Sequence, residues 1–429
     1  MANLTLAGHA RRHDRHAAGA SLLATIRRPR AAWSIWAGCA ALWMVLHFVN
    51  HPAMLDLAVY RSEGDALRHG LALYGNIGAP FDLKGTYPPF ATMLFVPLTA
   101  VPLTVCYLAA GLANLALIVA AVALTRRLLG PERLPAESVP LISAALIWVE
   151  PVYLTLHYGQ INLALLVLVL WDLTAPVGAR RGGIGIGLAA AIKVTPGLLI
   201  VYLLLTRRWR AAATAVGTAL AATLVSAAVR PAETWRFWTD LVFRTDRVGN
   251  VASPENQSLR GVLARALGRM DPGTLGLLLT AVVVVAGLAA GVVAYRSLGE
   301  PAGVCAASIT GLLVSPVSWS HHWVWCVPIA VALVAAVRSG TRGARIATAG
   351  YLVTFASYTF WFFKSDPQAN LHMSAIDQAR SAPFVVFGLV FLGASAAVAA
   401  RRRATAATVG PVSRAERQYG PSRGSLGRT

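Results

Sequence analysis

Long apolar stretches recur from residue 32 to residue 400, and short segments rich in arginine separate them. A helix that crosses the hydrocarbon core of a bilayer needs about 20 predominantly apolar residues, and several stretches reach that length. Charged residues make up 13% of the chain, whereas soluble domains carry about 25%. The pattern therefore predicts an all-α polytopic membrane protein, a bundle of about 10 to 12 transmembrane helices in one domain over residues 32–400.

Apolar length and the positions of the arginines predict ten individual spans. They lie near 32–50, 103–125, 139–156, 160–175, 209–229, 273–295, 302–317, 321–338, 344–363 and 383–400. Arginine-rich loops mark the cytoplasmic side of a membrane protein. The basic segment 1–31 and the tail 401–429 are then both cytoplasmic. The tail is rich in Gly, Pro, Ser and Arg, and we expect it to be disordered.

The net charge of +20 is the second unusual property of the chain, and such a charge can indicate nucleic-acid binding. The basic residues, however, stand mostly at the ends of apolar stretches and in the tails, as in cytoplasmic loops. We therefore expect a lipid bilayer, and no nucleic acid, as the partner. The same topology places two long loops, 51–102 and 230–272, on the outer side. Short interfacial helices are expected near 58–73 and 89–101.

Residues 183–205 do not fit a simple span, because arginine pairs flank the stretch on both sides. A single crossing would place one of these pairs on the outer side, against the charge rule. A re-entrant pair of half-helices that turns near Lys193–Gly197 keeps both pairs inside, and Pro196 supplies the break. One kinked span remains the alternative.

The densest polar and aromatic segments all fall on the predicted outer side. They are Asp56–Tyr60, Tyr87–Pro89, His157–Gln160, Pro254–Ser258 and Ser320–His322. Segments that are distant in sequence thus share one face of the membrane. A site built from several parts of the chain requires this convergence, whereas scattered solvated loops do not.

Two charged residues stand out near these segments. Asp56 directly follows the first span and is a candidate general base; the alternative is a helix N-cap, where Asp is also favoured. Lys193 lies in an apolar stretch, where a charged group usually faces a cavity or a partner. A substrate phosphate or a structural ion pair with Glu150 would each explain it. Glu63 is expected to be solvated or paired with Arg61.

Several other polar residues have two interpretations each. His157, Gln160 and Asn162 either bind sugar hydroxyls or satisfy the backbone of a tight turn. His321 and His322 point in different directions on a helix, so one of them is a candidate contact to a phosphate and the pair is not a metal site. The four cysteines match no metal motif, and P-loop, GxSxG, HExxH and dinucleotide signatures are missing. No cofactor is predicted, and a divalent metal is left open without support.

Six motifs together resemble one known family. DLAVY, GTYPPF, HYGQINLALL, KVTP, PENQSLRG and SPVSWSHHW, spread over residues 50–325, are similar to glycosyltransferase family 87. Its members include mycobacterial α-1,2-mannosyltransferases of phosphatidylinositol mannosides and an arabinofuranosyltransferase of cell-wall arabinan. The resemblance implies the GT-C architecture, a site on the extracytoplasmic face of the plasma membrane, a polyprenyl-phosphate-sugar donor, and inversion at the anomeric carbon.

The resemblance, together with the residue types, predicts the roles of individual residues. It implies that Asp56 is the base. The donor phosphate is then assigned to Lys193, His321, His322 and Arg260. The sugar or acceptor is assigned to Tyr60, Tyr87, His157, Gln160, Asn162, Glu255 and Asn256. The expected reaction moves mannose from polyprenyl-phosphate-mannose to a glycolipid or lipoglycan acceptor and forms an α-1,2-mannoside.

Three other functions remain as alternatives. DLAVY, with Gly70 and Tyr74 after it, looks closer to the mannosyltransferases, but an arabinofuranosyltransferase that uses polyprenyl-phosphate-arabinose belongs to the same family. A polyprenyl-lipid transporter or flippase would suit a broken helix near Lys193, although the sequence shows no two related halves. A non-catalytic assembly subunit would not require polar residues concentrated on one face.

Overall fold

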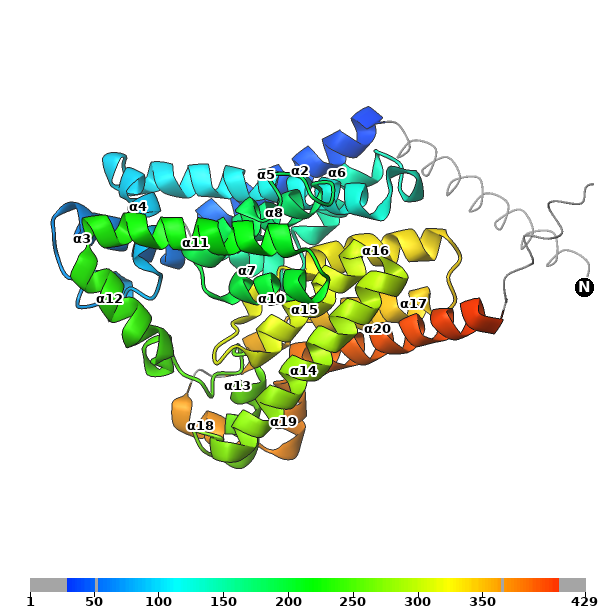
Figure 1. Ribbon diagram of the computed structural model, residues 1–429. Coiled ribbons are helices and arrows are strands. Elements are labelled where there is room, and N and C mark those ends of the chain that lie inside the picture. The colour runs from blue at the N-terminus through cyan, green and yellow to red at the C-terminus, as the bar shows by residue number, and fades with distance from the viewer. Residues whose placement is uncertain (1–28, 51–52, 364–365, 409–429) are drawn as a thin grey trace, which may run out of the picture.

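The computed structural model describes residues 29–50, 53–363 and 366–408. Its regular structure is helical, and the β contact within those ranges is one isolated antiparallel bridge between Asn256 and Trp319. Long helices lie side by side, and α3, α4 and α12 gather at one end of the bundle, at the left of Figure 1. The prediction of an all-α multi-pass membrane protein is confirmed.

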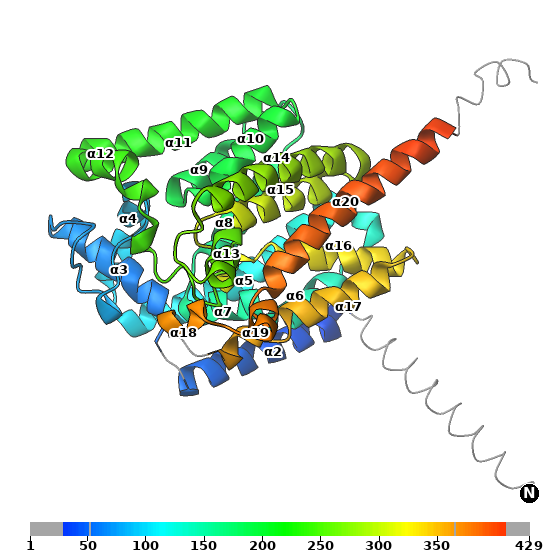
Figure 2. The same ribbon diagram turned by 90° about the horizontal axis from the view of Figure 1, so that it is seen from below.

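Five helices of the described residues are long and apolar enough to cross a membrane. They are α2 (Pro29–Asn50), α5 (Leu103–Leu129), α11 (Trp209–Val229), α14 (Gly273–Leu298) and the part Pro383–Arg402 of α20 (Pro383–Thr408). Each matches one predicted span. The start of α2 and the end of α20 lie at the same end of the bundle in both views (Figures 1 and 2). The first residues of α2 and the last residues of α20 therefore lie on one side of the bundle, as the arginine pattern predicts.

The predicted start of the disordered tail, residue 401, lies inside a helix. Residues 401–408 continue α20 instead of starting a disordered segment. The other predictions for the tail and for the basic N-terminal segment fall on residues 409–429 and 1–28, which lie outside the described residues.

The other five predicted spans are shorter or broken. They correspond to α6 (Ser138–Leu146) with α7 (Glu150–Tyr158), α8 (Asn162–Leu173), α15 (Glu300–Val314), α16 (Cys326–Arg338) and α17 (Ala344–Phe355). A helix of 12 to 15 residues is roughly 18–23 Å long, less than the ~30 Å hydrocarbon core. These spans were predicted too long, because a helix buried inside a bundle, such as α15, is as apolar as one that faces lipid.

The predicted span 139–156 is bent by 73° between α6 and α7. Pro151 stands in the first turn of α7, where its missing N–H cannot continue the hydrogen bonding of α6. The Tyr358 hydroxyl donates to the Trp148 carbonyl oxygen at 2.8 Å. This bond satisfies a backbone acceptor at the break, as burial requires.

Residues 183–205 form two half-helices, α9 (Ile184–Ile192) and α10 (Leu198–Leu205), joined through Lys193 and the 3-10 turn η4 (Thr195–Gly197). The start of α9 lies beside the start of α11, since a Cβ added at Gly183 would stand 2.0 Å from the Ala211 carbonyl oxygen. Only residues 206–208 separate the end of α10 from α11. Both ends of the segment therefore lie at one end of α11, as the re-entrant interpretation predicts.

Polar contacts fix both ends of this hairpin. The Asp172 carboxylate accepts hydrogen bonds from the backbone N–H groups of Gly183 (2.8 Å) and Ile186 (3.2 Å), so that it caps α9 from a neighbouring helix. After α10, the guanidinium of Arg208 binds Glu300 of α15 at 2.8 Å. The hairpin is thus anchored at its ends, and Lys193 stands at its turn.

The segments predicted to lie on the outer side consist of short helices, as predicted for 58–73 and 89–101. They are α3 (Leu55–Arg68), η1 (Pro80–Asp82), α4 (Pro89–Phe95), η2 (Val96–Ala100), α12 (Pro231–Thr239), η5 (Leu241–Phe243), η6 (Thr245–Arg247), α13 (Leu259–Leu267), η7 (Ser320–His322), η8 (Thr359–Phe362), α18 (Pro367–Leu371) and α19 (Ala375–Arg380); the turn η3 (Pro131–Arg133) follows α5. A Cβ at Gly64 would stand 2.6 Å from the Phe95 carbonyl oxygen, so glycine allows α3 to pack closely on α4.

Arg265 of α13 joins the segments that carry Ser253 and Ser381. It is 1% exposed, and it donates to the Ser253 carbonyl oxygen at 2.7 Å and to the Ser381 carbonyl oxygen at 2.9 Å. Burial lowers the pKa of its guanidinium to about 10, against the opposing effect of Glu255. The charge persists at neutral pH and holds the loop that carries Glu255.

Replacing Arg265 by Ala should destabilise the protein by about 3 kcal/mol or more, because the buried carbonyl groups of Ser253, Asn256 and Ser381 each lose a hydrogen bond from the guanidinium. The measurement is unfolding of the purified protein in detergent by denaturant titration. The matched control is Arg269→Ala, since Arg269 is exposed and donates only to the nearby Pro272 carbonyl. Equal stability of the two variants would contradict the role of Arg265.

Candidate active site

Gln160 is the centre of a buried hydrogen-bond network that joins three separate segments of the chain. Its side-chain oxygen accepts from the Tyr60 hydroxyl at 2.7 Å and from the Tyr87 hydroxyl at 3.3 Å. The two hydroxyls also contact each other at 2.8 Å. Tyr60 comes from α3, Tyr87 from the loop before α4, and Gln160 from the turn between α7 and α8. Three predicted sugar or acceptor residues are thus brought together.

Asp56 lies in the first turn of α3, one helical turn before Tyr60. The N-cap of α3 is Met54, which forms no side-chain capping bond, so the alternative that Asp56 caps this helix is wrong. The Asp56 carboxylate instead forms a side-chain hydrogen bond with Gln160 and interacts with the charge of Lys193. Its side chain is partly exposed, as a group that exchanges a proton with a substrate must be.

Burial raises the pKa of Asp56 to about 6, while the Gln160 hydrogen bond and the Lys193 charge act in the opposite direction. The carboxylate is therefore ionised at neutral pH. Its proton affinity is greater than that of a solvated Asp, which suits a general base that works near pH 7.

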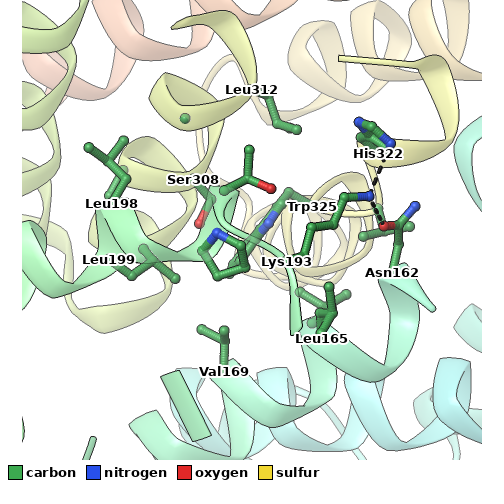
Figure 3. A pocket seen from close by; sticks show the side chains of 16 residues that line it. Asn162, Leu165, Val169, Lys193, Leu198, Leu199, Ser308, Leu312, His322 and Trp325 are labelled. Carbon is green, nitrogen blue, oxygen red and sulfur yellow. Dashed lines mark hydrogen bonds between the residues drawn. The ribbon is translucent and has the colours of Figure 1, made fainter. Parts of the chain in front are cut away.

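Lys193 stands between Asn162 and His322 (Figure 3). Its ammonium group donates to the Asn162 side-chain oxygen at 3.0 Å and contacts Nε2 of His322 at 3.1 Å. An ammonium group can only donate, so Nε2 of His322 accepts and the ring is neutral with its proton on Nδ1. The alternative of an ion pair between Lys193 and Glu150 is wrong, since both Glu150 carboxylate oxygens lack a hydrogen-bond partner among the described residues.

The backbone of η7 is tied to α7 and α8. The His321 carbonyl oxygen accepts from the Asn162 amide at 2.9 Å and from the Thr155 hydroxyl at 3.1 Å. Nε2 of His321 also lies 3.5 Å from the side-chain nitrogen of Gln160. Both imidazoles are therefore held beside the network that contains Asp56 and Lys193.

A cavity adjoins this cationic end of the site. Asn162, Lys193 and His322 form its polar end, Thr195 and Ser308 add hydroxyl groups, and most of the remaining lining is apolar. The apolar side chains include Leu165, Val169, Leu198, Leu199 and Leu312, from α8, α10 and α15 (Figure 3). A ligand with an anionic head and a hydrocarbon chain would find a suitable surface at each end.

Four predicted site residues lie outside the network. His157 contacts the rings of His47, Tyr153 and Tyr158. Arg260 donates to the Thr245 hydroxyl at 3.0 Å, and Glu255 accepts from Ser253. The roles of these three in binding stay predictions.

Asn256 requires a correction. It is fully buried, and its amide binds the Val251 carbonyl oxygen and the Ser318 N–H, both at 2.9 Å. Because its hydrogen-bonding groups are engaged with backbone, we assign Asn256 to holding the outer loop rather than to contact with an acceptor.

Glu63 was assigned to solvent or to Arg61, and this was wrong. It is 0% exposed and accepts from the Thr86 N–H at 3.0 Å. Burial raises its pKa to about 8, so it is neutral at pH 7. It fixes the loop that carries Tyr87. Glu63 follows Asp56 by seven residues, so both lie on one face of α3. This spacing was the feature of the sequence that could have indicated the burial of Glu63.

The pKa of Asp56 leads to a prediction for the pH dependence of catalysis. Only the ionised carboxylate accepts a proton, so kcat/KM should rise with pH, reach half of its plateau at a pH of about 6, and then level off. At pH 5 the rate should be about one tenth of its plateau. The measurement is initial rates between pH 4.5 and 8 at subsaturating acceptor. A flat profile would exclude Asp56 as the titrating base.

No group of three or more His, Cys, Asp or Glu residues suited to a metal ion occurs among the described residues. The prediction that the reaction needs no cofactor stays a prediction, and activity in the presence of a chelator tests it.

Comparison with known proteins places the chain among enzymes. The family model described as glycosyltransferase family 87 matches residues 86–316. A polyprenol-phosphate-mannose-dependent alpha-(1-2)-phosphatidylinositol pentamannoside mannosyltransferase of Mycobacterium tuberculosis is 37% identical over 312 residues, which cover 71% of this chain and 72% of the relative. The protein of the same description from Mycolicibacterium smegmatis is 35% identical over 350 residues, 76% of this chain and 82% of the relative.

A second protein of Mycobacterium tuberculosis, an alpha-(1-2)-phosphatidylinositol mannoside mannosyltransferase that also depends on polyprenol-phosphate-mannose, is 35% identical over 326 residues, 70% of this chain and 75% of the relative. No solved structure gives a significant match.

Proposed function

This chain belongs to glycosyltransferase family 87, and from this membership and the geometry of the site we propose that it transfers mannose from polyprenyl-phosphate-mannose to a glycolipid. The acceptor is a phosphatidylinositol mannoside, the new linkage is α-1,2, and the reaction takes place on the extracytoplasmic face of the plasma membrane. The observation that carries the proposal is the placement of the Asp56 carboxylate within the field of Lys193, which also binds His322.

The donor end of the site is the cationic end. A phosphodiester headgroup accepts hydrogen bonds from the Lys193 ammonium and is attracted by its charge. The apolar side chains of the adjoining cavity take up the first isoprene units of the chain. During transfer the leaving phosphate gains a negative charge. A fixed cation is stabilising there because it acts where charge develops.

The acceptor end is defined by the base. An acceptor hydroxyl near Asp56 gives its proton to the carboxylate as its oxygen forms a bond to the anomeric carbon. The bond between that carbon and the phosphate oxygen breaks at the same time, and polyprenyl phosphate leaves. One displacement inverts the anomeric centre, so a β-linked mannosyl phosphate gives an α-mannoside.

The proposal is tested with purified protein in lipid nanodiscs, supplied with polyprenyl-phosphate-mannose and a phosphatidylinositol mannoside. The expected product is heavier by one hexose, and linkage analysis should give an α-1,2 bond. Transfer of a pentose from polyprenyl-phosphate-arabinose in place of mannose would overturn the choice of sugar. Movement of donor lipid across a membrane without a new glycosidic bond would indicate a flippase.

A further inference from the structure

The turn at the tip of the α9–α10 hairpin carries hydrogen-bond donors that no other residue uses. Thr195 begins η4, and neither its backbone N–H nor its hydroxyl has a hydrogen-bond partner among the described residues. Thr195 is exposed, follows Lys193 by two residues, and lines the same cavity. The first N–H groups of a helix lack partners within the helix and are satisfied by a cap, by water or by a ligand. The tip therefore offers free donors beside a cation.

The ammonium group of Lys193 cannot satisfy a phosphate alone. It has three N–H donors, of which one is directed to Asn162 and another contacts His322. A single donor is left for a ligand, whereas both non-bridging oxygens of a phosphodiester accept hydrogen bonds. Among the described residues that line the cavity, Lys193 is the one with a formal charge. The cavity therefore matches one negative charge, and its other contacts to a phosphate have to come from neutral donors.

α15 forms the wall of the cavity beside the tip. A Cβ added at Gly311 would stand 3.5 Å from a side-chain carbon of Leu198, the first residue of α10. Ser308 precedes Gly311 by about one helical turn and lines the cavity (Figure 3). It is 8% exposed, and its hydroxyl has no hydrogen-bond partner among the described residues. Because a buried hydroxyl without a partner is costly, Ser308 indicates that the cavity receives a polar group.

The direction of the chain places a helix start at this site. η4 continues directly into α10, so the helix runs away from the tip. Aligned peptide dipoles give the first turn of a helix a partial positive charge, and phosphate groups bind there. Pro196 stands in this first turn, where its fixed φ favours the helical conformation. The tip thus combines a helix start, the hydroxyl of Thr195 and the ammonium group of Lys193.

We propose that the tip of the hairpin binds the phosphate of the donor lipid. Thr195 donates from its hydroxyl and its N–H, Ser308 donates from the neighbouring wall, and Lys193 supplies the charge. This inference rests on the proposed function and adds the neutral donors of the leaving group. The leucines of the same cavity favour a phosphate that carries a hydrocarbon chain over free phosphate.

These donors also act during the reaction. Hydrogen bonds to an anion strengthen as its charge increases. The phosphate gains negative charge as its bond to the anomeric carbon breaks, so Thr195 and Ser308 stabilise polyprenyl phosphate as it leaves. Neutral donors achieve this without a second cation, which would have to be buried without a partner when the site is empty.

The test measures binding of a prenyl lipid with and without its phosphate, so that it does not depend on turnover. Full-length protein in lipid nanodiscs is titrated with polyprenyl phosphate and, in a second experiment, with the corresponding polyprenol. Thr195→Val keeps the shape of the side chain and removes its hydroxyl. This variant and Ser308→Ala should each weaken binding of polyprenyl phosphate about tenfold, since each loses a hydrogen bond to a charged acceptor. Both should bind polyprenol as the wild type does.

Three further variants are controls. Thr195→Ser keeps the hydroxyl and should bind polyprenyl phosphate as the wild type does. Thr354→Val and Ser143→Ala are the matched controls, because the two hydroxyls donate to carbonyl groups of their own helices; both variants should bind normally. An excess of inorganic phosphate should not displace polyprenyl phosphate, and displacement would assign the tip to free phosphate instead of a lipid.

The inference is overturned if Thr195→Val binds polyprenyl phosphate normally. It is also overturned if Thr195→Val loses polyprenyl phosphate and polyprenol equally, since that pattern indicates a structural role. Normal binding by Ser308→Ala alone would remove Ser308 from the site. Failure of the proposed function looks different: the wild type and the variants would bind polyprenyl phosphate in the expected pattern, and the wild type would still form no mannosylated product.

Discussion

Asp56→Asn should reduce mannosyl transfer by about 10³-fold, within the range that loss of a general base typically produces. Asn has nearly the same shape and can still bond to Gln160, so the network of Tyr60 and Tyr87 should persist. It cannot take the proton of the acceptor hydroxyl. The measurement is kcat with saturating polyprenyl-phosphate-mannose and phosphatidylinositol mannoside. Binding of polyprenyl phosphate should remain, because the cationic end is unchanged.

The matched control for this change is Asp65→Asn. Asp65 lies on the same helix, is exposed, and forms only a contact with His69, so its variant should transfer mannose at the wild-type rate. An Asp56→Asn protein with more than a tenth of wild-type kcat would show that the acceptor proton goes elsewhere.

Lys193→Met should reduce transfer by about 10² to 10³-fold, the effect expected when one fixed group that stabilises developing negative charge is removed. Met fills a similar volume without charge or donors. His322 and Asn162 lose the group they share. Because the charge on phosphate increases during the reaction, kcat should fall more than KM for the donor rises. Steady-state kinetics with donor and acceptor varied in turn separates the two effects.

Lys84→Met is the control, since Lys84 is exposed in the loop before Tyr87 and should not affect rate. A Lys193→Met enzyme with normal kcat and a raised KM for the donor would mean that Lys193 only binds the ground state. Normal values of both would remove Lys193 from the site.

The sequence predicted the long helices better than the short ones. α5 and α14 are uninterrupted apolar runs, and their length alone indicates a span. The bend after α6 depends on Pro151 and on a bond from Tyr358, more than 200 residues away in sequence. A contact of that kind leaves no local pattern in the sequence. The hydropathy of residues 139–156 therefore predicts one span where the structure has two helices, α6 and α7.

Those site residues were predictable that are charged and adjoin long apolar runs. Asp56 and Lys193 stand out because each adjoins long apolar runs. Glu63 does not stand out, because α3 is a polar helix in which exposed carboxylates are common. Its burial depends on the loop at Thr86. The prediction for Asn256 was wrong in the opposite direction. Its polar motif suggested contact with substrate, whereas its amide is used to support backbone.

The hairpin of α9 and α10 determines how deep the reaction lies. Its half-helices have nine and eight residues, so each is roughly 13 Å long, less than half of a ~30 Å hydrocarbon layer. With both ends of the hairpin at one membrane surface, as the re-entrant interpretation predicts, we expect the tip with Lys193 to stop short of the opposite surface. A phosphate that reaches the tip would then lie below the plane of the surrounding lipid headgroups. Lengthening both halves by one turn would lift the ammonium by about 5 Å and separate the leaving group from the base.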